Sequence, residues 1–340
     1  MKLFKKIFVI FLASFLLSSC AQDSQRISLF IYDSKDPFII SLYNSIVREL
    51  YEDFKIKSYY AEGDQVLQNS DIANEIDSQR NDYLIVNIVD RMASRTILNK
   101  AKTKDIPVIF INREPLLVDI NTYEKSMYVG SDPISEGKLQ ANLVNDYFGG
   151  VDNFYNNFDK NKNNSIDLVL IKGEQGHQDT ENRSKFVVSE LVNYGYHVNI
   201  VSSAYCNWSR ETARNFFERE CKNRLDEIDL VVSNNDEMAI GVSNYLKTLE
   251  RDENYKNILE SYFPIIGIDG TSSGLQSVKS KDILGTIKND AVLQGKVIKM
   301  IIEYYENDLD FSNFPYEIEE GHFIKMKGDI ITFDNLDKFI

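Results

Sequence analysis

An imidazole, a carboxylate and a guanidinium lie within seven consecutive positions near the middle of the chain, at His177, Asp179 and Arg183. They follow the apolar run 168–171, which is typical of a buried strand, and precede 184–193, whose spacing predicts a helix. Loops that leave strand ends in open α/β sheets hold ligands. Two interpretations are open here. The side chains form a binding or acid–base site, or Asp179 caps the helix and pairs with Arg183 four residues later.

Apolar runs that we predict to be strands recur along the whole chain. They cover 26–32, 83–89, 107–111, 167–171, 197–203, 229–233, 264–268 and 283–287. The predicted helices between them include 38–54, 91–102 and 136–148. Near-continuous Val, Ile and Leu strands that alternate with helices are typical of parallel sheets covered on both faces. We therefore predict an α/β fold.

Polar or aromatic side chains follow most of these predicted strands. Besides the three residues above they are Asp36, Phe38, Asn112, Arg113, Trp208, Asn235, Asp269 and Asn289. Because the carboxyl ends of parallel strands meet at one edge of a sheet, we expect these residues to share a ligand cleft. Sugar hydroxyls can donate to carboxylates and accept from amides or a guanidinium, and pyranose C–H faces stack on aromatic rings. Three carboxylates would repel an anion, so the set favours a neutral sugar.

The N-terminus has the pattern of a secretory signal. Three lysines within 2–6 precede the apolar run 7–17, which is too short for a comfortable membrane span. The run ends in Leu17-Ser18-Ser19-Cys20, which resembles the bacterial lipoprotein processing box. That resemblance implies a signal peptide over 1–19 and a lipid on Cys20. The mature chain would then be tethered to the cell membrane and face the periplasm or the cell exterior.

The charge of the chain argues against nucleic acid as a partner. The formal net charge is −14, and removal of the three signal lysines takes it to −17. Phosphate binding needs clustered Lys and Arg, and no basic run follows the signal. The remaining length exceeds one ordinary core and predicts two lobes. Cys206 and Cys221 could form a disulfide in an exported chain, and two free, partly buried thiols are the open alternative.

Seven short motifs occur in a specific order along the chain. They are 36–38 (DPF), 110–115 (FINREP), 128–132 (YVGSD), 172–179 (KGEQGHQD), 233–236 (SNND), 267–269 (GID) and 285–290 (GTIKND). Together they resemble the bacterial periplasmic D-galactose/D-glucose-binding protein family, from Arg26 to about Phe339. The resemblance implies two Rossmann-like lobes with parallel sheets, joined by a three-segment hinge. The implied lobes are 24–131 plus 290–326 and 132–289 plus 327–340.

The same resemblance implies that D-glucose or D-galactose occupies the cleft between the lobes. The implied contacts are Asp36 at O4; Asn112 and His177 at O6 and the ring-proximal side; Asp179 and Arg183 at the anomeric hydroxyl and its neighbours; Asn235, Asp269 and Asn289 at O2 and O3; and Phe38 and Trp208 on the two ring faces. Closure of the lobes on the sugar would produce the form that the permease of an ABC transporter recognises. We expect the chain to act as a monomer.

The segment 159–167 resembles the calcium loop of that family. Oxygen-bearing side chains alternate along it, as an EF-hand-type loop requires. The implied calcium ligands are Asp159, Asn161, Asn163, the Ser165 carbonyl, Asp167 and the distant Asp229. Asn163 replaces the usual third aspartate and Asn164 replaces the turn glycine, so a lower calcium affinity is expected. A solvated, Asn-rich turn is the alternative.

Two other functions compete with transport. A carbohydrate hydrolase would use paired carboxylates such as Asp179 and Asp269. A sugar sensor would present the same fold to a chemoreceptor or a sensor kinase, beside the permease or in its place. A repressor would need a helix-turn-helix before the first strand, where this chain carries its signal and Cys20. We favour a binding protein without covalent chemistry.

Overall fold

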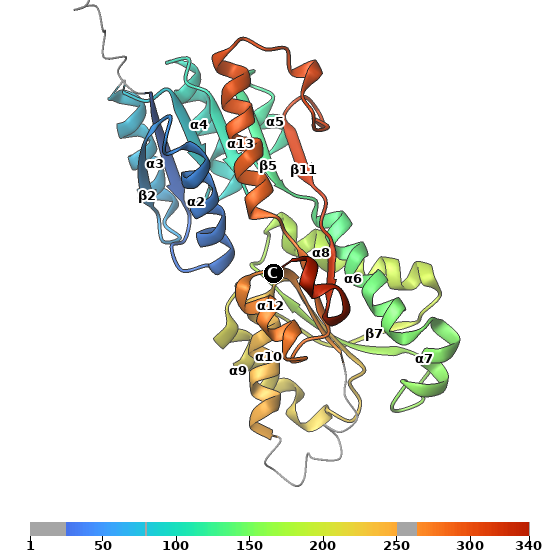
Figure 1. Ribbon diagram of the computed structural model, residues 1–340. Helices are drawn as coiled ribbons and strands as arrows, with labels where there is room; N and C mark the ends of the chain where they lie inside the picture. Colours follow the sequence, from blue (N-terminus) through green and yellow to red (C-terminus); the bar gives the residue numbers. More distant parts are fainter. Residues whose placement is uncertain (1–24, 79, 250–263, 340) are drawn as a thin grey trace, which may run out of the picture.

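The computed structural model describes residues 25–78, 80–249 and 264–339. These residues form two α/β lobes, each built on a six-stranded sheet (Figure 1). This arrangement confirms the fold class predicted from the alternation of strands and helices. The predicted signal 1–19 and lipidation site Cys20 lie outside the described residues. No helix within the described ranges is long and apolar enough to cross a membrane.

The first sheet has the strand order β11-β5-β4-β3-β1-β2, and its neighbouring strands are parallel. The strands are β1 (Arg26–Ile31), β2 (Lys55–Tyr60), β3 (Tyr83–Val86), β4 (Val108–Ile111), β5 (Ser126–Ser131) and β11 (Phe323–Met326). The helical elements of this lobe are α2 (Pro37–Leu50), α3 (Gln65–Asp77), η1 (Arg91–Ala93), α4 (Ser94–Lys102), α5 (Leu117–Ile120), α13 (Ala291–Glu306) and η3 (Phe311–Asn313). Alternate residues of β1 enter different cores: Ile27 and Leu29 pack with α2 and α13, and Phe30 packs with α3 and α4.

The second sheet has the order β12-β10-β9-β8-β6-β7, in which β12 alone runs antiparallel to its neighbour. Its strands are β6 (Ile166–Lys172), β7 (Val198–Tyr205), β8 (Leu230–Ser233), β9 (Ile265–Asp269), β10 (Gly285–Lys288) and β12 (Ile330–Thr332). The helical elements are α6 (Pro133–Phe148), α7 (Val151–Asn157), α8 (Gln178–Tyr194), α9 (Arg210–Cys221), η2 (Lys222–Arg224), α10 (Asp236–Leu249), α12 (Ser272–Lys279) and η4 (Phe333–Lys338). Successive residues of β6 again divide between two cores, so both faces of the sheet are buried.

Three segments connect the lobes (Figure 1). The chain crosses between β5 and α6, between β10 and α13, and through 327–329 between β11 and β12. Asp132 and Asp290 cap the two helices that start at these crossings, through backbone N–H groups of their first turns. Each cap satisfies otherwise unpaired N–H groups and fixes where the helix begins. The freely rotating part of each connection is therefore short.

The two cysteines of the described region are free thiols. Cys206 and Cys221 both lie in the core of the second lobe, so the structure favours the free-thiol alternative. Burial raises the pKa of each thiol to about 11. A thiol of that pKa is almost entirely protonated at neutral pH and is a poor nucleophile.

Candidate functional site

Residues that follow six different strands meet in one small cavity between the lobes. The strands are β1 and β4 of the first lobe and β6, β7, β8 and β9 of the second. The cavity is lined by Tyr32, Asp36, Phe38, Asn112, His177, Asp179, Arg183, Trp208, Asn235 and Asp269. Nine of these ten are residues that the sequence predicts to contact a sugar. The structure thus brings them together, whereas Asn289, the remaining predicted residue, does not line the cavity.

Three lining residues hold their backbones in the left-handed region. The φ angles are +60° at Asn112, +61° at Trp208 and +117° at Asp269. Such a conformation costs about 1–3 kcal/mol per residue and persists only where the surrounding structure enforces it. Gly173 permits the close approach of the Trp208 ring, because a Cβ at that position would lie 2.2 Å from the ring. Strained backbone conformations are common at functional sites. No residue pattern in the sequence predicts them here.

The stretch around His177 forms the beginning of α8. This helix starts at Gln178, six residues before the predicted start at 184. His177 caps it, since its Nδ1 accepts a hydrogen bond from the Asp179 backbone N–H at 3.1 Å. That bond assigns the proton to Nε2, which remains a donor for a ligand. Burial and the nearby Arg113 hold the pKa of His177 well below its usual value, so the ring is neutral at pH 7.

Protein groups fix the orientation of Arg183. Its Nε donates to Glu136 Oε2 at 2.7 Å, and its Nη1 donates to the Asn234 carbonyl at 3.0 Å. Its Nη2 lies 3.3 Å from Ser131 Oγ and 3.4 Å from Asp179 Oδ2. The ion pair expected from the spacing of Asp179 and Arg183 therefore exists, and both residues also line the cavity. The expected cap is wrong, because His177 and not Asp179 caps α8, while the expected pairing is compatible with a place in the cavity.

Glu136 is a buried residue of the site that sequence reasoning did not find. It has no solvent exposure, and burial raises its pKa to about 7 even though Arg183 opposes the shift. Its sequence position gave no sign of this role, because it occupies an ordinary place in the first turn of a predicted helix. The contact to Arg183 comes from the packing of α6 against α8, which are far apart in sequence.

Asp36 and Tyr32 form the wall contributed by β1 and α2. Asp36 Oδ1 accepts from the backbone N–H of Phe38 at 2.8 Å and of Ile39 at 3.2 Å, which caps α2. Its Oδ2 accepts from the Tyr32 hydroxyl at 3.1 Å. The Arg113 guanidinium lies 3.9 Å from the centre of the Tyr32 ring. Tyr32 was also missed, although an aromatic residue at the end of the first predicted strand was an available signal.

All three predicted asparagines already have partners within the protein, and Asn112 Oδ1 accepts from Asn87 Nδ2 at 3.1 Å. Asn235 Oδ1 accepts from the Met238 backbone N–H at 2.9 Å, at the start of α10. Asn289 Oδ1 accepts from Gln294 Nε2 at 2.7 Å, in the crossing between β10 and α13. Asn235, whose Nδ2 lies 3.4 Å from the Trp208 carbonyl, lines the cavity, while Asn289 lies at the crossing between β10 and α13.

The three carboxyl groups of the cavity lie in an environment that disfavours their charge. Burial raises the pKa of Asp36, Asp179 and Asp269 above their ordinary values, while Arg183 opposes the shift at Asp179 and Asp269. Asp269 shows the strongest effect, because the charges of Asp236 and Asp36 add to its burial. A ligand that brings hydroxyl donors would stabilise these groups as carboxylates.

The cavity is too narrow for a hexose in this conformation. About 20 Å³ is open to water, which is room for about one molecule. Two contacts join the lobes beside it: Arg113 Nη2 lies 2.7 Å from Glu174 Oε2, and Gln178 Nε2 lies 2.6 Å from Glu114 Oε2. A sugar ring can therefore enter only if the lobes move apart about the three crossings.

Internal hydrogen bonds hold the conformation of the loop that is predicted to bind calcium. The Nδ2 atoms of Asn161 and Asn163 lie 2.5 and 2.8 Å from Asp167 Oδ2, and Asp159 accepts backbone N–H groups of the loop. Asp229 accepts from the Asp167 N–H at 2.9 Å. Across 25–78, 80–249 and 264–339, no three His, Cys, Asp or Glu residues gather so that they could hold a metal ion. In this arrangement the amide nitrogens of Asn161 and Asn163 face the Asp167 carboxylate, and an amide turned by 180° would present its oxygen instead. Calcium binding by this loop stays a prediction.

Known proteins resemble the chain over most of its length. The family model for the periplasmic binding protein domain matches residues 27–306. The D-galactose/methyl-galactoside binding periplasmic protein of Haemophilus influenzae is 31% identical over 284 residues, which are 83% of this chain and 81% of that protein. A putative rhizopine-binding protein of Rhizobium meliloti is 28% identical over 301 residues, covering 86% and 87% of the two chains. An ABC transporter solute binding protein from Bacillus halodurans, solved with bound myo-inositol, has a TM-score of 0.75 at 22% identity and covers 94% of this chain and 99% of its own.

Proposed function

We propose that this protein, which belongs to the periplasmic binding protein domain family, captures a neutral monosaccharide and delivers it to the permease of an ABC transporter. The expected ligands are D-glucose and D-galactose. The observation that carries the proposal is the cavity between the lobes, where residues from six strand ends converge. Three of them have positive φ angles, a conformation that costs free energy in residues other than glycine.

The chemistry of the cavity suits a sugar better than an ion. Asp36, Asp179 and Asp269 can each accept from a hydroxyl, and such charge-assisted bonds are short and directional. His177 Nε2 supplies a neutral donor, and Phe38 and Trp208 offer aromatic surfaces for the C–H faces of the ring. The named ligands of two relatives, a galactoside and myo-inositol, are also neutral and rich in hydroxyls. This agreement supports a carbohydrate as the ligand.

The proposed cycle involves closure of the lobes and no covalent step. The sugar would enter when the lobes separate and would favour their closure by bonding to both of them. We further propose that a lipid on Cys20 tethers the protein to the cell membrane, and that the protein acts as a monomer. A chemoreceptor or a sensor kinase would recognise the closed form by the same mechanism.

Calorimetric titration of the purified protein with a panel of monosaccharides tests this proposal. We expect one site that binds D-glucose or D-galactose tightly, with weaker binding of pentoses. The absence of heat with every sugar in the panel would refute the proposal. Turnover of a glycoside by the pure protein would instead favour the hydrolase hypothesis built on Asp179 and Asp269.

A further inference from the structure

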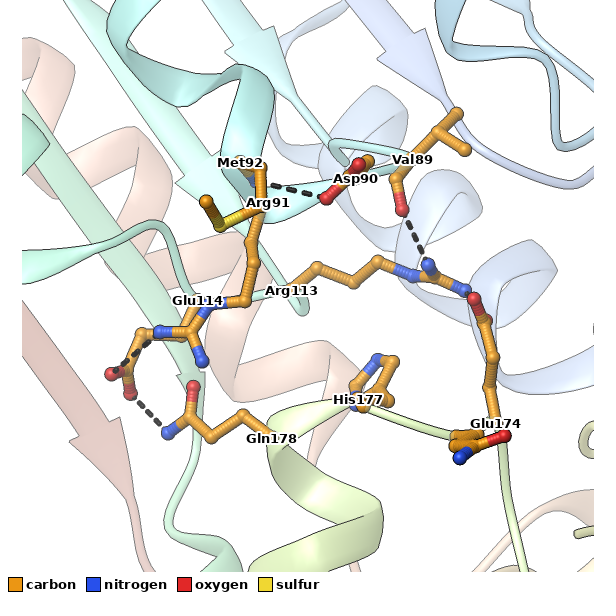
Figure 2. A pocket seen from close by; sticks show the side chains of 11 residues that line it. Val89, Asp90, Arg91, Met92, Arg113, Glu114, Glu174, His177 and Gln178 are labelled. Atoms are coloured by element: carbon orange, nitrogen blue, oxygen red, sulfur yellow. Dashed lines mark hydrogen bonds and ion pairs between the residues drawn. The ribbon is translucent and has the colours of Figure 1, made fainter.

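Two pairs of side chains join the lobes beside the sugar cavity, and they run in opposite directions. Arg113 of the first lobe donates from Nη2 to Glu174 Oε2 of the second at 2.7 Å. Gln178 of the second lobe donates from Nε2 to Glu114 Oε2 of the first at 2.6 Å. Figure 2 shows both pairs together with His177, which also lines the sugar cavity. Each lobe thus supplies one donor and one carboxylate.

Contacts within the first lobe fix the orientation of Arg113. Its Nη1 donates to the Val89 carbonyl at 2.5 Å, and its guanidinium lies 3.9 Å from the centre of the Tyr32 ring. The Arg113 side chain is only 7% exposed. Because both partners belong to the same lobe as Arg113, a rotation between the lobes leaves these contacts intact. Little side-chain freedom is therefore lost when Arg113 pairs with Glu174.

Glu114 is held by its own lobe in the same way. Arg91 Nη2 lies 4.0 Å from its Oε1, and Lys325 Nζ lies 3.5 Å from its Oε2. Figure 2 shows Arg91 and Gln178 reaching the same Glu114 carboxylate, one from each lobe. Hydrogen bonds to a charged group are stronger than those between neutral groups. The Gln178–Glu114 contact therefore also favours the closed arrangement.

We propose that Arg113, Glu114, Glu174 and Gln178 form an interlobe latch, whose two bonds stabilise lobe closure without touching the sugar. The four residues line the neighbouring cavity of Figure 2 and lie outside the set that lines the sugar cavity. They are positioning residues: the latch forms whenever the lobes close, with or without a ligand, and both bonds must break before a sugar can enter. The inference rests on the proposed function only for its effect on sugar affinity.

A latch of this kind should act equally on every ligand. If the closed arrangement is the one that binds, the apparent Kd equals the intrinsic Kd divided by the fraction of unliganded protein that is closed. A weaker latch lowers that fraction and raises Kd by the same factor for each sugar. A residue that contacts the ligand would instead change Kd by a factor that depends on the sugar.

Electron–electron double resonance between spin labels on the two lobes measures the closed fraction without ligand. The labels are placed at Val66→Cys in the first lobe and Val192→Cys in the second, where the native side chains are 79% and 53% exposed. Cys20→Ser removes the lipidation site from the labelled chain. The two buried thiols of the second lobe should not be labelled, because their raised pKa makes them poor nucleophiles.

Glu174→Ala should lower the closed-to-open ratio of the unliganded protein about fivefold, as expected for the loss of a half-exposed ion pair. Gln178→Leu should lower it by a similar factor. Glu220→Ala is the matched control and should leave the ratio unchanged. Glu220 pairs with Arg219 at 2.6 Å and is 47% exposed, against 44% for Glu174, but that pair lies within α9. Salt at about 1 M should open the wild type more than Glu174→Ala, because it screens the ion pair.

Calorimetry with D-glucose, D-galactose and other monosaccharides completes the test. In Glu174→Ala, Kd should rise for each sugar by the factor by which the closed fraction falls. An unchanged closed fraction in this variant would overturn the latch, and so would Kd changes that differ by more than about twofold between sugars. Sugar binding with an unchanged closed fraction refutes the latch alone. A lowered closed fraction in a protein that binds no sugar refutes the proposed function alone.

Discussion

Asp269 allows a test in which ligand binding and stability should change in opposite directions. Its φ of +117° is one that glycine adopts without strain, and its carboxyl is buried near Asp236 and Asp36. Asp269→Gly should relieve about 1–3 kcal/mol of backbone strain, against about 0.5–1 kcal/mol for the added freedom of glycine in the unfolded chain. Loss of the disfavoured carboxylate should add about 1 kcal/mol. We expect a net gain of about 2 kcal/mol and a Tm about 4–8 °C higher.

The same substitution should nearly abolish sugar binding. Each hydrogen bond from a hydroxyl to a carboxylate contributes about 1.5–3 kcal/mol, so the loss of two weakens binding by about a hundredfold or more. Asp36→Ala is the comparison, because Asp36 lines the same cavity at an ordinary φ of −68° and caps α2. It should weaken binding and also lower Tm, since the lost cap costs about 1 kcal/mol.

The two variants are compared by their calorimetric Kd values for the sugar and by their Tm without ligand. Unchanged sugar affinity in Asp269→Gly would show that the carboxylate is not a ligand contact. A lower Tm in Asp269→Gly, as expected for Asp36→Ala, would show that relief of backbone strain at residue 269 is smaller than the cost of glycine's added freedom in the unfolded chain. Either result would refute the reasoning.

Three further predictions concern charge. Burial raises the pKa of Glu136 and of Asp236 to about 7, so the native state keeps protons that the unfolded chain has released, and stability falls as pH rises through that value. The unliganded Tm should be about 2–4 °C higher near pH 6.5 than near pH 8, and a flat profile would contradict this. Glu136→Gln leaves Asp179 as the ion-pair partner of Arg183. It should lower the free energy of unfolding by about 1–3 kcal/mol and weaken sugar binding. Wild-type stability and affinity in this variant would show that the Glu136–Arg183 pair contributes to neither. If the Asn-rich loop 159–167 holds calcium, excess EDTA should lower Tm and added calcium should restore it; no shift with either would exclude the site.

Strand-end chemistry made most of the cavity predictable from the sequence. Long Val, Ile and Leu runs mark buried parallel strands, and the residues after them must meet at one edge. The strands that were missed lack this signal. They are β2, β5, β11 and β12. Lys55 and Lys57 interrupt the apolar pattern of β2, serine and glycine interrupt that of β5, and β11 and β12 have only four and three residues. Sequence spacing therefore located the loops that carry the site better than it located the sheet edges.

What sequence could not predict depends on packing between distant elements. Glu136 meets Arg183 only because α6 packs on α8. The position of the Trp208 ring depends on the missing Cβ of Gly173, which comes from a different strand end. None of these relations has a local sequence pattern.

The hinge and the cavity share hydrogen bonds, which gives a physical route from binding to closure. Arg183 Nη2 contacts Ser131 Oγ at the β5–α6 crossing, and the Asn289 N–H donates to the Asp269 carbonyl at the β10–α13 crossing. Two of the three connections between the lobes are thus bonded to residues of the proposed site. A rotation at either crossing must therefore change the position of Arg183 or Asp269 relative to the first lobe. A ligand can shift the lobe equilibrium only by its differential affinity for the two arrangements. A sugar that bonds to Asp36 on one lobe and Asp269 on the other would have a different affinity for the open and closed arrangements of the lobes.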